Sequence, residues 1–193
     1  TDPFRKYVLT RYLTGKCIEL FSYTKNERKF TIGRINVAFN YLVAAQKYLQ
    51  REFLTSKDVR VQLWELLGKP GIGKSKSVDA IVMQLRALVP EIPKGDLVYV
   101  RSHDRWWNGY CGQVIVIYDD IAHDKNPKID FVYELFSIGS GTFTNVPMAF
   151  TKDMVFTSTL VIMTNNIPII TKVGAAPTVS ALKRRLISEH YEP

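Results

Sequence analysis

The feature that most constrains the fold of this sequence is a glycine-rich segment, Gly68 to Ser75, which fits the pattern G-x-x-x-x-G-K-[ST]. An apolar stretch at 61–67 precedes it and predicts a β-strand, and residues 75–89 after it have the spacing of a helix. A strand, this loop and a helix in that order are typical of a phosphate-binding loop. The alternative is a glycine turn that fits by chance, and the flanking strand and helix make it the weaker interpretation.

Each part of the loop predicts a contact with a nucleotide. Glycines let backbone N–H groups approach the phosphates, and the N-terminus of the following helix adds positive potential. We expect Lys74 to reach the β- and γ-phosphates and Ser75 to bind Mg²⁺. The loop contacts the phosphates and not the base, so this motif does not distinguish ATP from GTP. The residues predicted to bind ATP are Gly68, Lys69, Pro70, Gly71, Ile72, Gly73, Lys74, Ser75 and Lys76.

Polar side chains follow two further apolar stretches. Residues 114–118 form a β-branched run typical of a buried parallel strand, and Asp119 and Asp120 come directly after it. We expect Asp119 to hold Mg²⁺ and Asp120 to polarise the attacking water, although acidic pairs at strand ends also cap helices. Residues 160–163 predict another strand, after which Asn166 is placed to hydrogen-bond the γ-phosphate or the water. Asparagine is also a common turn former.

Two adjacent arginines near the C-terminus, Arg184 and Arg185, are candidates for an arginine finger. We expect residues 181–186 to lie on a helix that begins near Thr178. Neighbouring residues on a helix point in different directions, so one arginine would pair within its own subunit while the other reaches the nucleotide of a neighbour. The alternative is a solvated basic helix.

The order of the predicted elements indicates an α/β fold. Alternating strands and helices are typical of a mainly parallel sheet flanked by helices on both faces. We expect this P-loop core to span residues 61–193, after a basic helical segment at 1–60 in which residues 4–21 and 32–53 have helical spacing. The strands are expected at 61–67, 97–100, 114–118 and 160–163.

The net charge of +8 is concentrated in the first third of the chain. Residues 1–60 hold 12 Lys and Arg against 5 Asp and Glu, a net charge of +7, whereas residues 61–193 hold 14 against 13, a net charge of +1. This asymmetry favours contact with phosphate, in nucleic acid or at an anionic membrane surface, or else a solvated helix face. For the first helix, packing on the main domain is the favoured interpretation.

Length and composition exclude several other classes of protein. The 193 residues, of which 46% are hydrophobic, suit one well-buried domain with a small appendage and not a large multidomain enzyme. No run of 18 apolar residues is present, so no bilayer-spanning segment is predicted. Cys17 and Cys111 lie in no CxxC or Cys/His cluster, so the sequence supports neither a disulfide framework nor a zinc site. The start at Thr1 without a leader favours a piece excised from a longer chain.

In this order the motifs resemble those of the superfamily 3 helicases, and specifically the picornavirus-like branch, the 2C-type ATPases of positive-strand RNA viruses. The resemblance extends from about Val61 to Leu186. Asn108 stands where the family usually has Asp, and His123 where Gln is common. Besides the loop and the acidic pair, the resemblance rests on Trp-Asn-Gly-Tyr-Cys-Gly-Gln at 107–113, Pro-Met-Ala at 147–149, Phe-Thr-Ser at 156–158, Pro-Thr at 177–178 and Ala-Leu-Lys-Arg-Arg at 181–185.

The resemblance implies a five-stranded AAA+-like core and a homo-oligomer, a hexameric ring that hydrolyses ATP between its subunits. Arg184 and Arg185 match the family's finger position, and Asn166 matches its sensor position. The segment around Lys152 is implied to face the pore, where this lysine would contact single-stranded RNA. The family works with other viral replication proteins at membrane-associated replication complexes in the host cytoplasm, which leaves peripheral membrane association through N-terminal segments as an expectation.

The leading interpretation is therefore an ATP-hydrolysing helicase or RNA remodeller in the replication of a picorna-like virus. One alternative is a nucleotide-gated scaffold that does not unwind. Another is the helicase domain of a circular single-stranded DNA virus replication protein, although the clustered histidines of its nicking endonuclease are absent from the sequence. Trp106 and Trp107 are candidates for base stacking, and packing is the favoured interpretation.

Overall fold

A five-stranded sheet forms the centre of the computed structural model, in the order β2-β3-β4-β1-β5, and every neighbouring pair of strands is parallel. The structure describes residues 3–24, 37, 40, 41, 61–123, 130–140, 145–148, 155–172 and 177–190. The α/β core and its five strands confirm the expected AAA+-like P-loop fold. The strands are β1 (Gln62–Leu67), β2 (Val98–Arg101), β3 (Ile115–Asp119), β4 (Leu160–Asn165) and β5 (Leu186–His190).

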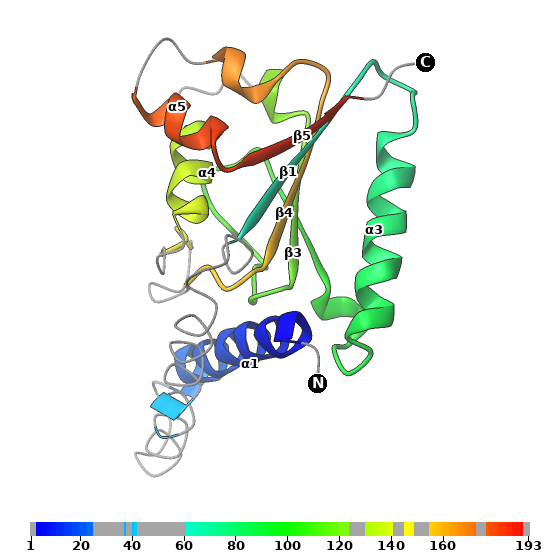
Figure 1. Cartoon of the computed structure of the whole chain (residues 1–193). Helices are drawn as coiled ribbons and strands as arrows, with labels where there is room; N and C mark the ends of the chain where they lie inside the picture. Colours follow the sequence, from blue (N-terminus) through cyan, green and yellow to red (C-terminus); the bar gives the residue numbers. More distant parts are fainter. Residues whose placement is uncertain are drawn as a thin grey trace.

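The sheet is buried on both faces because its central strands carry apolar side chains on both sides. On β3, Ile115 and Ile117 pack into one hydrophobic cluster, whereas Val116 and Tyr118 pack into the other. Alternate residues of a strand point to opposite faces, so a continuous apolar run requires cover on both faces. Helix α3 covers one face, and α4 and α5 cover the other (Figure 1). The predicted layers are thereby confirmed.

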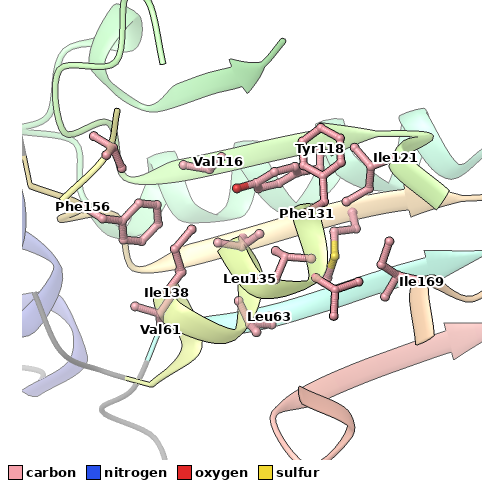
Figure 2. Close-up of a cluster of buried hydrophobic side chains, with 14 of the residues drawn as sticks. Val61, Leu63, Val116, Tyr118, Ile121, Phe131, Leu135, Ile138, Phe156 and Ile169 are labelled. Carbon is pink, nitrogen blue, oxygen red and sulfur yellow. The ribbon is translucent and has the colours of Figure 1, made fainter. Parts of the chain in front are cut away.

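Helix α4 (Phe131–Gly139) supplies much of the core on its face of the sheet. Leu135 and Ile138 of this helix point toward Leu63 of β1 (Figure 2). The side chain of Asp130 caps the helix, accepting a hydrogen bond from the backbone N of Tyr133 at 2.9 Å. Our sequence interpretation did not include this helix, although its cap and its apolar spacing are the signals that predict one.

Helix α3 (Lys74–Leu88) begins with the last two residues of the glycine-rich segment, Lys74 and Ser75, close to the predicted range of 75–89. The residue before it, Gly73, has a φ of 103°, a left-handed conformation that L side chains rarely adopt. Val78 and Leu85 are the buried residues of the helix, and they pack on the sheet face opposite α4. The loop is therefore held between a central strand and a packed helix.

Helix α1 (Pro3–Thr24) packs against the core, as its apolar spacing predicts, at the edge where β2, β3 and β4 begin (Figure 1). Arg11 is only 4% exposed, and its guanidinium donates to the carbonyls of Thr157 and Phe156 at 2.8 and 3.2 Å. Lys16 pairs with Asp96 at 3.1 Å, and Arg5 pairs with Glu91. Basic side chains of this helix are therefore bound to the core.

A glycine contact brings α1 close to the loop before β3. A Cβ added at Gly112 would lie 2.7 Å from Oγ1 of Thr157 and 3.0 Å from Cα of Gly15. Gly112 also has a positive φ of 76°. Only glycine meets both demands at this position.

The C-terminal helix is shorter than predicted. We expected helix through residues 181–186, but α5 (Pro177–Lys183) ends before Arg184, and Leu186 already begins β5. The prediction was wrong because β5 pairs in parallel with β1, where Leu186 lies beside Leu63. Strand pairing here outweighs the helical tendency of the local sequence.

The remaining expectations for residues 1–60 concern parts of the chain that are mostly outside the described residues. The second predicted helix, at 32–53, falls there except for residues 37, 40 and 41, and the domain boundary near residue 60 stays a prediction. In the part of the chain that the structure describes, no helix is both long enough and apolar enough to cross a bilayer. Cys17 and Cys111, both described, form no disulfide.

Candidate active site

The residues predicted to bind phosphate and Mg²⁺, together with the predicted sensor, collect at the carboxyl ends of β1, β3 and β4. Parallel strands end at the same edge of a sheet, where the loops after them meet. Backbone hydrogen bonds join these ends: Gly68 N donates to Asn165 O at 3.3 Å, and Asp120 N donates to Thr164 O at 2.7 Å. The start of the glycine-rich loop and the second aspartate are both anchored to the end of β4.

The glycine-rich loop leaves space beside its backbone. Gly71 and Gly73 have φ values of 81° and 103°, and a Cβ at either residue would have no other atom within 4 Å. These glycines are therefore required by their backbone conformation and not by close packing. An open loop of this kind at the N-terminus of α3 fits an anionic phosphate chain.

The structure brings Lys74 and Asn166 together, as the predicted site requires. The Nζ atom of Lys74 donates to Oδ1 of Asn166 at 2.9 Å, and to the carbonyls of Gly68 and Lys69 at 2.5 and 3.1 Å. The ammonium group thus lies at the start of the loop, beside the predicted sensor. Phosphate oxygens bind an ammonium group more strongly than neutral carbonyls do, because the hydrogen bond is then between opposite charges.

The two aspartates after β3 have different environments. Asp119 is exposed, and its Oδ1 accepts a hydrogen bond from Oγ1 of Thr164 at 2.5 Å. Asp120 is half-buried and has a φ of 46°, an uncommon conformation that aspartate tolerates better than most residues. The chain therefore turns sharply at Asp120, directly after the strand.

The oxygen donors at this edge fit Mg²⁺ better than they fit a transition metal. Mg²⁺ is bound through one or two protein oxygens together with phosphates and waters. Asp119 offers a carboxylate and Ser75, at the start of α3, a hydroxyl, and both residues are exposed. Within the described ranges, no group of three or more His, Cys, Asp and Glu residues is placed to hold a metal.

Two residues that our sequence interpretation missed lie directly beneath the site. Asn165 and Glu65 are both fully buried, and Nδ2 of Asn165 donates to Oε1 of Glu65 at 2.8 Å. A glutamate within the apolar stretch 61–67 is the signal that sequence reasoning had available. Buried carboxylates are rare unless they are hydrogen-bonded, so this one marks a specific polar contact.

An aromatic cluster packs behind β3. Trp107 is fully buried and stacks on Tyr99 with ring centroids 5.6 Å apart, which confirms packing and not base stacking for this tryptophan. Burial raises the pKa of Tyr118 well above its usual value, and Glu134, which accepts the Tyr118 hydrogen bond at 2.8 Å, raises that pKa further. Trp106 is half-buried beneath the guanidinium of Arg105, 4.9 Å from its ring centroid.

A model of an RNA helicase family matches residues 64–167, just over half of the chain. The chain belongs to this RNA helicase family. The match includes the glycine-rich loop, the acidic strand β3 and Asn166. The family lies in helicase superfamily 3, as the ordered motifs suggested, and the chain is accordingly of the NTPase and helicase type of enzyme.

Relatives of this RNA helicase family member include viral polyproteins. The chain is 32% identical over 90 residues to the genome polyprotein of Rice tungro spherical virus (strain A), a match that covers 46% of the chain and 3% of the polyprotein. It is 36% identical over 80 residues to the replicase polyprotein of Drosophila C virus (strain EB), covering 39% of the chain and 4% of that polyprotein. The chain thus spans a small part of these relatives.

Two further similarities lie outside the RNA virus polyproteins. The replication-associated protein of Goose circovirus is 33% identical over 66 residues, which cover 34% of the chain and 18% of that protein. Among solved structures, a closed-state reconstruction of Hsp104 aligns with a TM-score of 0.38 and 13% identity, covering 99% of this chain and 35% of the other. That TM-score is too low to support an argument.

The helicase-family arginines lie at the opposite edge of the sheet from the phosphate loop. Both precede β5, whose first residue, Leu186, pairs with Leu63 near the start of β1, whereas the loop follows the end of β1 at Leu67. A strand of this length spans about 17–20 Å. An arginine in this turn is therefore separated from the phosphate loop of its own subunit by the length of a strand.

The two arginines also differ from each other. Arg185 donates from Nη1 to the carbonyl of Ala181 at 2.7 Å, and its guanidinium lies 5.2 Å from the ring centroid of Phe136 in α4. Arg184 is exposed. The structure thus gives Arg185 contacts within its own subunit. Lys152, the predicted RNA contact, lies outside the described residues.

Proposed function

We propose that this helicase-family domain hydrolyses ATP with Mg²⁺ and uses the reaction to remodel single-stranded RNA during replication of the genome of a picorna-like virus. The observation that carries the proposal is the contact between Lys74 and Asn166 beside the acidic end of β3. It supports ATP hydrolysis because the Lys74 ammonium and the Asn166 amide lie together at the glycine-rich loop, where the proposed mechanism requires them. Relatives named genome polyprotein and replicase polyprotein support a role in replication.

In this mechanism, Lys74 exchanges its carbonyl acceptors for oxygens of the β- and γ-phosphates. Ser75 and Asp119 would hold Mg²⁺, which when bound neutralises the charge of the phosphates. The Asp120 carboxylate accepts a proton from the attacking water and orients it toward the γ-phosphate. Asn166 donates its amide to the γ-phosphate or to the water, so the site distinguishes ATP from ADP.

The turn that holds Arg184 and Arg185, here called the arginine turn, supports hydrolysis between subunits. An arginine that is a strand's length from its own phosphate loop can complete a site only in a neighbouring copy. Arg184, which is exposed, is the finger in this proposal, and Arg185 holds the turn against α4. The assembly is a homo-oligomeric ring, a hexamer by family resemblance, with Lys152 toward its RNA-binding pore. Its place is the membrane-associated replication complex in the host cytoplasm, with other viral replication proteins.

The first test is phosphate release from ATP by the wild type and by Lys74→Ala over a range of protein concentrations. We expect turnover that rises more than linearly with concentration, and a loss of about 10²–10³-fold in the variant because the phosphates lose their ammonium donor. Lys94→Ala, an exposed lysine outside the site, is the matched control. Wild-type nucleotide binding without turnover would instead favour the nucleotide-gated scaffold.

Adding single strands of RNA or DNA of equal length and sequence tests the substrate. We expect RNA to stimulate turnover more than DNA. The opposite preference would favour the helicase domain of a circular single-stranded DNA virus, an alternative that the similarity to the Goose circovirus protein keeps open.

A further inference from the structure

Glu65 is a buried carboxylate in the interior strand β1, and the proposed mechanism makes no direct use of it. Its side chain is fully buried, and β1 lies between β4 and β5 in the sheet. Burying a carboxylate carries a large desolvation cost, and apolar residues in place of buried charged groups are often at least as stable. The position of Glu65 therefore suggests a role other than stability.

The hydrogen bonds of Glu65 connect three elements around the site. Its Oε1 accepts from Nδ2 of Asn165 at 2.8 Å and from the backbone N of Ile169 at 2.7 Å. Its Oε2 accepts from Oγ of Ser188 in β5 at 3.2 Å. Asn165 and Ile169 lie on either side of Asn166 in the chain, so Glu65 fixes the backbone before and after the sensor.

Asn165 extends this network to the acidic strand. Its Oδ1 accepts from the backbone N of Ala122, two residues after Asp120, at 3.2 Å. A carboxylate oxygen accepts and a backbone N–H donates, so the Asn165 amide has one orientation that satisfies both partners. Through Asn165, Glu65 also holds the segment that follows the turn at Asp120.

The direction of Asn166 follows from these contacts. Asn165 is the last residue of β4, and Asn166 follows it directly. Successive side chains of a strand point to opposite faces, so a residue that continues from Asn165 starts out away from the buried carboxylate. Asn166 then meets Nζ of Lys74 at 2.9 Å. We propose that Glu65, acting through Asn165, is a positioning residue for ATP hydrolysis, because it holds Asn166 toward Lys74 and fixes the turn at Asp120. This proposal rests on the proposed ATPase function.

The test is a charge exchange between the two partners. Asn165→Asp places a second carboxylate against Glu65, and we expect kcat to fall by about tenfold or more while KM for ATP changes less than about threefold. Adding Glu65→Gln restores the bond between the two side chains, because the new amide donates to the new carboxylate, whose other oxygen still accepts from Ala122. The amide nitrogen then occupies the place of Oε1 and no longer accepts from the backbone N of Ile169, so the network is restored in part. We expect the double variant to have a kcat at least about threefold above that of Asn165→Asp.

A matched control separates positioning from loss of stability. Glu134 is a largely buried carboxylate that accepts from Arg101, Trp107 and Tyr118, so Glu134→Gln is the same substitution in a different polar network. We expect it to lower the melting temperature without the fall in kcat at a temperature where the protein is folded. A fall in kcat equal to that of Asn165→Asp would overturn the positioning role of Glu65.

The outcomes distinguish this proposal from the proposed function. Wild-type turnover together with undiminished kcat in Asn165→Asp overturns the positioning role and leaves the ATPase intact. A folded double variant no more active than Asn165→Asp also overturns it. If Asn165→Asp alone does not fold, a folded double variant without measurable turnover decides the matter. If the wild type binds ATP and releases no phosphate, the proposed function fails and the positioning role fails with it.

Discussion

Where the strands end, at the carboxyl edge of the sheet, Gly71 and Gly73 of the phosphate loop have open space beside them. Where the strands begin, at the amino edge, Gly112 and Gly15 lie so close that neither has room for a Cβ. Cations differ in the same way between the edges. Lys74 is held by carbonyls and an amide that phosphates can replace, but Arg11 is buried against the carbonyls of Phe156 and Thr157. Glycines and basic residues therefore pack closely at one end of the strands, whereas at the other end they leave the space and the cation that the proposed nucleotide site needs.

The arginine turn also lies at the amino edge, but there only Arg185 is held by packing, whereas Arg184 is exposed. These two residues provide the sharpest test of the comparison. We expect Arg184→Ala to lower ATP turnover by about 10³-fold, because the neighbour's γ-phosphate loses a cation in the transition state. Mixing this variant with Lys74→Ala should restore part of the turnover, since an intact loop then meets an intact arginine. Phosphate release at ring-forming concentrations measures both effects.

Arg185→Ala is the matched variant for the same turn. It removes the bond to the Ala181 carbonyl and the packing on Phe136, so we expect a loss of about 1–2 kcal/mol in the free energy of unfolding. Failure of the Arg184→Ala and Lys74→Ala mixture to gain activity would contradict a shared site.

The glycine contact at the amino edge predicts a loss of stability without a loss of chemistry. Gly112→Ala places a Cβ 2.7 Å from Oγ1 of Thr157 at a φ of 76°. We expect the free energy of unfolding to fall by about 2–4 kcal/mol, from backbone strain and from overpacking. Chemical denaturation measures the change, and ATP turnover per folded molecule should equal that of the wild type.

Gly109→Ala is the control, because Gly109 has a φ of 80° and nothing within 4 Å of an added Cβ. It carries the strain without the clash, so we expect a fall of only about 1 kcal/mol. Equal losses in the two variants would show that the contact with α1 contributes little.

The smallest expected effect comes from the buried tyrosines behind β3. Burial raises the pKa of Tyr110 and of Tyr118, so both hold their protons more tightly in the folded state. Their contribution to stability is complete below the unfolded-state pKa of about 10 and is lost as the pH rises through the folded-state values, by at most about 1.4 kcal/mol per pH unit for each tyrosine.

Denaturant unfolding between pH 7 and pH 11 measures this slope. Tyr118→Phe should make it shallower, whereas Tyr133→Phe, at an exposed position, serves as the control. An identical slope in all three proteins would contradict the role of the buried phenols.

Much of the fold could be predicted because its signals are local. The glycine-rich loop between a strand and a helix, the β-branched run before Asp119 and the strand before Asn166 each carry their evidence within a few residues. The structure then brings Lys74 and Asn166 together, since the carboxyl ends of parallel strands meet at one edge. The distance between these two residues along the chain does not by itself predict this contact.

The features that sequence reasoning missed depend on partners far along the chain. Arg184 and Arg185 were expected on a helix, but the pairing of β5 with β1 ends α5 before them. The basic residues of α1 suggested phosphate contacts as well as packing, and the carbonyls that bind Arg11 lie more than a hundred residues away. In the sequence, Glu65 only interrupts an apolar strand, and its role becomes evident from its hydrogen bond with Asn165.

The phosphate loop and the arginine turn lie at opposite ends of β1, so the two ends of the subunit present different surfaces. A contact that joins the arginine end of one copy to the nucleotide end of the next uses two different surfaces, so it is heterologous. Repeating such a contact closes into a ring or continues as a helical filament. A two-fold dimer formed through one self-complementary patch, in contrast, would not repeat this head-to-tail contact around a closed assembly.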